Sequence, residues 1–318
     1  MSQAPRAISR DDTLLTPEFM HQLDRLDVMS RKILTGKLQG ERRSKKKGQS
    51  VEFADYRNYV VGDDLRFIDW NLYARLDKLF LRLFMEEEDL AVSVAIDVTA
   101  SMDYGDPNKL MYAKRLAAAL GYVGLVNYNR VNLYAFTDAV TEQLPGLRGR
   151  RPVPQMLGFL DGLGKGAKPQ AASGGGGASG GGDLENVCKR LALLQRQPGL
   201  IILVSDFFDK GELGDAFRYL ASEKHDTYAV QLLSPQELDP VKGQVVGDLR
   251  LRDVEDGDLA EVSITPALVK RYKTNLEAYC QHVRDQCVRR SIAYLMSDTS
   301  VPFDSVVLKY LRQRGLLG

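Results

Sequence analysis

The sequence has little of what marks secreted and membrane-spanning proteins. It contains three cysteines in 318 residues, too few for a disulfide framework, which favours a reducing compartment. Its longest apolar runs, 90–96 and 200–204, are far shorter than the roughly 20 residues of a membrane helix. The opening residues, MSQAPRAISRDD, contain no apolar stretch, so we expect no secretory signal. These absences predict a soluble cytoplasmic protein that does not insert into a membrane.

An excess of charge of one sign is also missing. The chain has 43 Lys and Arg against 42 Asp and Glu, a formal net charge of +1. Such a chain has no overall field that would draw it to nucleic acid or to anionic lipid. The three histidines (His21, His225 and His282) are scattered and belong to no nucleophile or zinc motif. We therefore expect neither a nucleic-acid partner nor an enzyme of the Ser-His-Asp or Cys-His kind.

From residue 90 onward, apolar strands alternate with helical patterns. Strands are predicted over 90–97, 131–136, 199–209, 228–233 and 292–296, and helices over 109–126, 152–163, 184–194, 213–222, 266–290 and 302–314. Strands joined through helices of this length imply parallel crossovers. The prediction is an α/β fold with a doubly wound, mostly parallel sheet over 90–318, carrying a small β insertion at about 240–264.

Other parts of the chain do not show this alternation. We expect a disordered tail over 1–15 and then an N-terminal helix and accessory β-containing region over 16–89. Thr16 fits an N-cap and Gly36 a stop for that helix. The segment SGGGGASGGG, at 173–182, predicts a flexible loop, because no Gly-Lys-Ser/Thr follows it to form a phosphate-binding loop.

Polar side chains at the ends of two buried strands carry the candidate chemistry. Asp97, Thr99 and Ser101 place a carboxylate and two hydroxyls at the carboxyl end of one strand, where open α/β sheets bind ligands. Asp206 closes a second apolar strand and supplies another carboxylate. Oxygen donors of this kind suit a hard cation such as Mg²⁺. The alternative is an ordinary turn in which Asp97 or Ser101 caps backbone amides.

These residues carry a resemblance to known families. Asp97-x-Thr99-x-Ser101 with a distant Asp206 resembles the metal-ion-dependent adhesion site of von Willebrand factor A domains. The upstream segment is similar to the signature of the bacterial family called domain of unknown function 58. That signature is read from EFADYR at 52–57, GDDLR at 62–66, IDWN at 68–71 and AR at 74–75.

The resemblance implies a von Willebrand A-like (Rossmann-like) fold beside a small β region. It implies a metal at Asp97, Thr99, Ser101 and Asp206, and a MoxR-type AAA+ ATPase as partner. The implied role is a non-enzymatic, metal-dependent protein-binding adaptor or chaperone-like protein. Gly182 stands where the family motif has a Thr, so we expect weak or partner-dependent binding of Mg²⁺, with Mn²⁺ and Ca²⁺ as alternatives.

The signature segment is dense in aromatic and charged side chains, and three roles are open for it. We favour packing of a small subdomain with internal ion pairs over a protein-docking surface. A nucleic-acid stacking platform beside the basic run RRSKKK is the third. The residues concerned are Asp55, Tyr56, Arg57, Asp63, Asp64, Arg66, Asp69, Trp70 and Arg75.

Two further functions compete with the adaptor. One is a metal-assisted phosphohydrolase with Asp97 as nucleophile, although Thr99 stands where such chemistry uses a second acid. The other is a scaffold in which the metal site is vestigial.

Overall fold

The structure, a computed structural model, describes residues 13–26, 53–84, 90–164, 183–195, 197, 199–209, 211–221, 225–240, 247–252 and 259–311. The chain divides into two compact units, which we call the large unit (1–32 with 90–318) and the small unit (33–89). Residues 1–12 of the predicted tail, the basic run at 42–47 and the Gly-rich loop at 173–182 lie outside the described residues.

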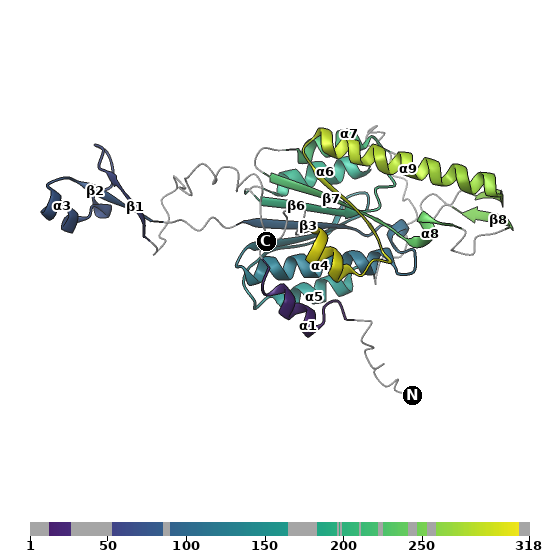
Figure 1. Cartoon of the computed structure of the whole chain (residues 1–318), viewed down its shortest axis with the longest axis horizontal. Helices are drawn as coiled ribbons and strands as arrows, with labels where there is room; N and C mark the ends of the chain where they lie inside the picture. The colour runs from purple at the N-terminus through teal and green to yellow at the C-terminus, as the bar shows by residue number, and fades with distance from the viewer. Residues whose placement is uncertain are drawn as a thin grey trace, which may run out of the picture. The chain divides into compact units, whose positions relative to one another are not determined.

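A six-stranded sheet runs through the middle of the large unit (Figure 1). Its strands are β3 (Ala91–Asp97), β4 (Arg130–Phe136), β5 (Val140–Leu147), β6 (Gly199–Ser205), β7 (His225–Leu233) and β10 (Ala293–Asp298). Their order is β10-β7-β6-β3-β4-β5, and every neighbouring pair is parallel except β4 with β5. The predicted α/β class with a mostly parallel sheet is confirmed. The antiparallel edge strand β5 was not predicted, because Pro145 and Gly146 interrupt its apolar pattern.

Helices cover both faces of this sheet (Figure 1). One face carries α4 (Lys109–Val126) and α5 (Val153–Gly162), and the other carries α6 (Asp183–Leu194), α7 (Leu213–Leu220) and α9 (Pro266–Arg289). The side chains of α6, α7 and α9 share a buried cluster with β6 and β7. Coverage on both sides explains why β3, β6 and β7 are buried along their whole length. No helix in the described part of the chain has the length and apolarity needed to cross a bilayer.

The N-terminal helix α1 (Pro17–Leu23) begins where the sequence predicts, since Thr16 Oγ1 accepts a hydrogen bond from the Phe19 amide at 3.3 Å. It ends well before Gly36. It packs against α4 of the large unit, where Asn127 Nδ2 donates to the Leu26 carbonyl at 2.7 Å. The sequence-based division, which joined this helix to the accessory region, differs from that packing. Leu14 and Leu15, expected in a disordered tail, are buried.

Shorter elements complete the large unit. The hairpin β8 (Gly247–Arg252) and β9 (Leu259–Ile264) forms an antiparallel pair inside the predicted β insertion. The turn η3 (Ala100–Met102) follows β3, and α8 (Pro235–Leu238) follows β7. The short helix α10 (Phe303–Ser305) and the π-helical turn η4 (Val306–Leu311) stand where one terminal helix was predicted.

The described residues of the small unit form a two-stranded antiparallel sheet and one short helix. They comprise β1 (Phe53–Asn58), the turn η2 (Leu65–Phe67), α3 (Trp70–Leu76) and β2 (Phe80–Phe84). An accessory β-containing region was predicted here.

Candidate functional site

The strand order places a topological switch point at the carboxyl end of β3. From β3 the chain moves to β4 on one side and later to β6 and β7 on the other, and ligands of open α/β sheets bind at such a switch point. Asp97 ends β3, Ser205 ends β6, and Asp206 follows directly. Because Ile96 pairs with Val204, the two strands end side by side. The structure therefore brings the two predicted acids to one edge of the sheet.

Asp97 is 6% exposed and accepts hydrogen bonds on both carboxylate oxygens. Oδ1 accepts from the Thr99 amide at 2.9 Å and from the Thr99 hydroxyl at 2.6 Å, while Oδ2 accepts from the Ser205 hydroxyl at 2.6 Å. The Thr99 hydroxyl also lies 3.0 Å from Ser101 Oγ. We call Asp97, Thr99 and Ser101 the oxygen cluster. The three predicted motif side chains meet in it.

The surroundings of Asp97 disfavour its charge. Burial raises the pKa of Asp97 to about 6, and the nearby negative charge of Asp206 adds to the rise. Hydrogen bonds from Ser205 and Thr99 oppose it. At neutral pH the carboxylate is therefore ionised in a place where it has lost most of its hydration, and a bound cation would compensate for that loss.

Asp206 is held by a partner that the sequence did not suggest. Its Oδ2 lies 2.8 Å from Nζ of Lys109, the first residue of α4, and its Oδ1 accepts from the Phe208 amide at 3.2 Å. Lys109 is 0% exposed, and its ammonium also donates to Glu237 Oε1 at 2.5 Å. The fourth predicted metal ligand is thus paired with a buried ammonium.

Glu237 is fixed in place by its own helix. In α8 the Ser234 hydroxyl accepts from the Glu237 amide, and Glu237 Oε2 accepts from the Ser234 amide at 2.7 Å, which is a capping box. Oε1 remains for Lys109. The ammonium therefore joins the ends of three neighbouring strands, because Lys109 follows β3, Asp206 follows β6 and Glu237 follows β7.

Sequence reasoning missed Lys109 and Glu237, although each leaves a signal. Ser234-Pro-Gln-Glu237 spells a capping box directly after a buried strand. Lys109 opens a helix whose remaining side chains are nearly all buried, and a cation at a helix N-terminus opposes the helix dipole. A lysine at that position indicates that something other than helix formation holds it there.

The edge of the sheet carries surplus negative charge. Asp97, Asp206 and Glu237 contribute three carboxylates against the single ammonium of Lys109, a surplus of two when all are ionised. Buried charges of one sign need a counter-charge. In the described residues no group of three or more His, Cys, Asp or Glu side chains that could hold a metal ion is found. The oxygen cluster combines one carboxylate with two hydroxyls, and oxygen donors are the kind that hard cations prefer.

The loop after β6 is held in a sparsely populated conformation. Phe207 has φ of 60°, which is rare for a bulky side chain. Its amide donates to Ser205 Oγ at 2.9 Å, and its carbonyl accepts from Tyr279 Oη of α9 at 2.5 Å. Strained residues of this kind persist where the surroundings fix them and are typical of functional sites. The backbone around Asp206 is therefore positioned from two sides.

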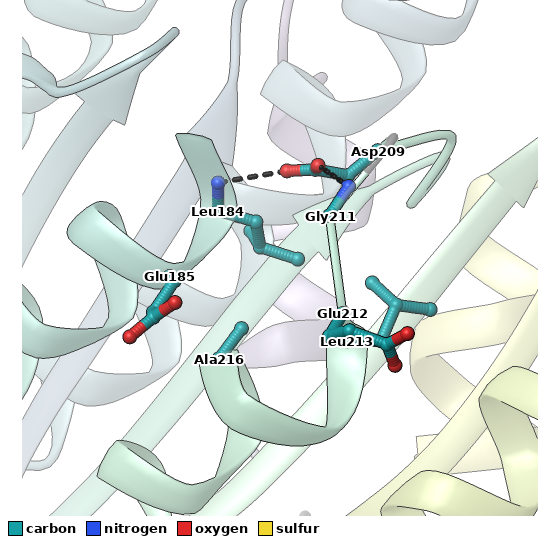
Figure 2. A pocket seen from close by; sticks show the side chains of 7 residues that line it. All are labelled: Leu184, Glu185, Asp209, Gly211, Glu212, Leu213 and Ala216. Atoms are coloured by element: carbon teal, nitrogen blue, oxygen red, sulfur yellow. Dashed lines mark hydrogen bonds between the residues drawn. The ribbon is translucent and has the colours of Figure 1, made fainter. Parts of the chain in front are cut away.

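The start of α6 is anchored by the same loop. Asp209 Oδ2 accepts from the Leu184 amide at 2.7 Å, and its Oδ1 accepts from the Gly211 amide at 2.6 Å, as Figure 2 shows. A small pocket here is lined by Leu184, Glu185, Asp209, Gly211, Glu212, Leu213 and Ala216 (Figure 2). These residues do not overlap the predicted metal ligands. Gly182, which replaces the expected Thr, lies outside the described residues.

In the small unit, Asp69 organises part of the signature. Its Oδ1 accepts from the amides of Asn71 and Leu72 at 3.0 and 3.1 Å and so caps α3. Its Oδ2 accepts from Tyr56 Oη at 3.1 Å and lies 3.4 Å from Nε of Arg82. The Leu72 amide and these other contacts lower the pKa of Asp69, against the opposing effect of burial. Asp69 and Tyr56 therefore have a structural role.

Other signature residues form the internal ion pairs that were predicted. Arg57 Nη2 lies 2.7 Å from Asp63 Oδ1, and Arg66 Nη2 lies 2.7 Å from Asp64 Oδ2. Two more signature residues have local positions: Asp55 Oδ1 accepts from the next amide in the chain at 2.8 Å, and Arg75 lies in the last turn of α3.

The helix α3 presents apolar side chains to solvent. Trp70, Tyr73 and Leu76 follow at three-residue steps and are 58%, 40% and 54% exposed. The rings of Trp70 and Tyr73 meet edge to face at 6.2 Å. Packing of the small subdomain, the role favoured for this segment as a whole, therefore leaves the side chain of Trp70 largely exposed. We call the three residues the α3 strip.

Comparisons with known proteins add a family. Uncharacterized proteins of Mycobacterium bovis and Mycobacterium tuberculosis are each 28% identical over 254 residues, 79% of this chain and 76% of theirs. A conserved hypothetical protein BatB from Bacteroides thetaiotaomicron has a TM-score of 0.42 at 16% identity, over 70% of this chain and 98% of that chain. Proximal thread matrix protein 1 from the mussel byssus has a TM-score of 0.34 at 14% identity, over 71% of this chain and 44% of that chain.

The family model described as "Protein of unknown function DUF58" matches residues 55–279. The matched stretch contains the signature residues from Asp55 onward, the oxygen cluster, Lys109, Asp206 and Glu237. Because this match spans well over half of the chain, the protein belongs to the DUF58 family.

Proposed function

We propose that the protein is a non-enzymatic adaptor that binds a partner protein through a divalent cation held at Asp97, Thr99 and Ser101. The observation that carries this proposal is the meeting of these oxygens at the switch point of the sheet, beside surplus buried carboxylate charge. Mg²⁺ suits such a set and keeps sites free for water or for an acidic side chain of the partner. Mn²⁺ and Ca²⁺ are the alternatives.

A MoxR-type AAA+ ATPase is the partner that the resemblance to the family implies. An AAA+ ATPase would supply work, while this chain would supply recognition in a von Willebrand A-like domain. The α3 strip supports a protein-docking role, because exposed tryptophan and tyrosine are enriched in interfaces. The three thiols are free of disulfides, which is consistent with the cytoplasm as the proposed location.

The proposal is tested with the purified chain and a MoxR-type ATPase from the same genome. In size-exclusion chromatography we expect a complex in Mg²⁺ that dissociates in chelator. Asp97→Ala should abolish the complex, whereas Asp285→Ala, which removes an exposed acid of α9, should leave it intact. Association that persists in chelator would overturn the proposal that a cation bridges the two proteins.

One observation favours a second candidate, the scaffold with a vestigial site. Lys109 already supplies a cation to Asp206, as expected if an internal ammonium has replaced a metal. A scaffold would bind its partner equally well with Asp97 and Asp206 both changed to Asn, and this variant separates the two functions.

A further inference from the structure

The placement of Lys109 is costly unless its ammonium has a task at the sheet edge. The side chain is completely buried, and a buried lysine requires close counter-charges. It finds two, at 2.8 Å on Asp206 and 2.5 Å on Glu237, and its Nζ lies 5.7 Å from the centre of the Phe208 ring. Asn108, the N-cap of α4, needs no help from it, because its own side chain accepts from the Met111 amide.

The ammonium and a bound metal would use the same oxygens. Asp206 Oδ2 and Glu237 Oε1 both accept from Lys109, so neither of these atoms is available to a metal while the ammonium is present. The oxygen cluster, in contrast, holds only neutral hydroxyl and amide donors on its single carboxylate. A metal in this chain would therefore meet one carboxylate that is not paired with the ammonium, where three lie at the same edge.

We propose that Lys109 is a built-in cation that keeps Asp206 and Glu237 out of the metal's coordination sphere and so sets a low affinity for divalent cations. This inference rests on the proposed function and adds how cation binding at that site is regulated. A site with one carboxylate and two hydroxyls binds a divalent cation weakly by itself, because affinity rises with the number of charged ligands. An acidic side chain of the partner then completes the site, so cation binding and partner binding depend on each other.

Mn²⁺ binding, measured by calorimetry and by the electron paramagnetic resonance signal of free Mn²⁺, tests the proposal. The decisive variant is Lys109→Met combined with Glu237→Gln, which removes the ion pair, conserves net charge and leaves Asp206 without its ammonium. We expect its Mn²⁺ affinity to rise by about tenfold or more. Adding Asp206→Asn should remove the gain, because Asp206 is the ligand that was released.

Two controls address charge and folding. Lys270→Met removes one exposed positive charge from α9 and should leave Mn²⁺ affinity within about twofold, since exposed charges are screened. Circular dichroism confirms that each variant is folded. Should the double variant fail to fold, Mn²⁺ binding by Asp206→Asn in the otherwise unchanged chain decides. A loss of Mn²⁺ affinity of about threefold or less supports the proposal. A loss of Mn²⁺ affinity as complete as that caused by Asp97→Asn overturns it.

The outcomes separate this proposal from the function on which it rests. A double variant that folds and binds Mn²⁺ no more tightly than the unchanged chain overturns the role of Lys109, while Asp97-dependent binding in the unchanged chain would still support the adaptor. The third outcome is that the double variant binds Mn²⁺ and the unchanged chain does not. That result would support the role of Lys109 and count against the cation-dependent adaptor.

Discussion

The sheet edge of the large unit and the small unit both contain ion pairs, and they differ in burial. Lys109 and Asp206 lie 2.8 Å apart with side chains 0% and 3% exposed. Arg66 and Asp64 lie 2.7 Å apart, but the arginine is 84% exposed. An exposed pair contributes little to stability, whereas removing one member of a buried pair leaves an uncompensated charge. Nearly equal distances therefore describe two interactions of very different consequence.

The two regions also differ in what they offer to a partner. The sheet edge offers oxygen atoms and surplus negative charge, while the α3 strip offers aromatic and aliphatic surface. The first kind of contact is sensitive to cations and to pH, and the second to the loss of apolar area. Single substitutions in each region can therefore separate ionic from apolar recognition.

The largest effect is expected for Lys109→Ala. It leaves the buried Asp206 and the part-buried Glu237 without their ammonium, which should lower the free energy of unfolding by about 3–5 kcal/mol. Urea denaturation followed by far-ultraviolet circular dichroism measures the loss. The matched control is Arg66→Ala, for which we expect about 0–1 kcal/mol. Equal losses in the two variants would show that burial does not separate the two regions.

Asp97→Asn should stabilise the protein in chelator at pH 7.5. The pKa of Asp97 is about 6 in the folded protein, against 3.8 for an ordinary aspartate side chain, so ionisation disfavours the folded state above pH 6. Relief of that penalty is worth up to about 3 kcal/mol. The gain should shrink as pH falls from 6 towards 4, because the carboxyl of Asp97 is then protonated in the folded protein and increasingly so in the unfolded chain.

Chemical denaturation at pH 7.5 and pH 4.5 measures this difference in stability, and Asp138→Asn is the exposed control. Saturating Mg²⁺ should make the unchanged chain more stable than Asp97→Asn, because Mg²⁺ stabilises only the unchanged chain. Equal stability of the unchanged chain and Asp97→Asn at pH 7.5 in chelator would contradict the cost of the buried charge.

Trp70→Ala should weaken partner binding while leaving stability nearly unchanged. Trp70 is 58% exposed, so its removal costs little packing, but a tryptophan at the centre of an interface contributes roughly 2 kcal/mol or more to binding. Binding to the MoxR-type ATPase, measured by biolayer interferometry, should fall by about thirtyfold. Leu193→Ala, which removes an exposed apolar side chain of α6, is the control. Unchanged binding by Trp70→Ala would remove the α3 strip from the interface.

Much of the fold could be predicted because burial imposes simple patterns. Buried parallel strands are continuous apolar runs, and the helix predicted over 109–126 has the bounds of α4. The positions of Asp97 and Asp206 at one edge followed from parallel strands ending together. The edge strand β5 was missed because one of its faces is exposed and Pro145 interrupts it.

The partner of Asp206 could not be predicted, because it depends on three loops that meet only in the folded chain. Lys109 lies 97 residues from Asp206 and 128 from Glu237 in sequence. The lysine at the first position of α4 signals only that something holds its ammonium there, and no local pattern says which acids those are. The exposure of Trp70 was missed for a related reason, since aromatic density predicts packing only where enough surrounding chain exists to provide a core.

The smallest effect on stability is expected for Arg57→Ala, which removes an ion pair within the small unit. Arg57 Nη2 pairs with Asp63 at 2.7 Å, but its side chain is 43% exposed, so its loss should cost less than about 1 kcal/mol and the cost should fade in high salt. Trp70 is the only tryptophan of the chain, so its fluorescence during urea denaturation reports on the small unit alone. Asp63→Asn is the companion variant, because it removes the charge and retains an acceptor for the Val60 amide. A loss for Arg57→Ala as large as that of Lys109→Ala, or one that persists in high salt, would contradict the view that this pair is screened by solvent.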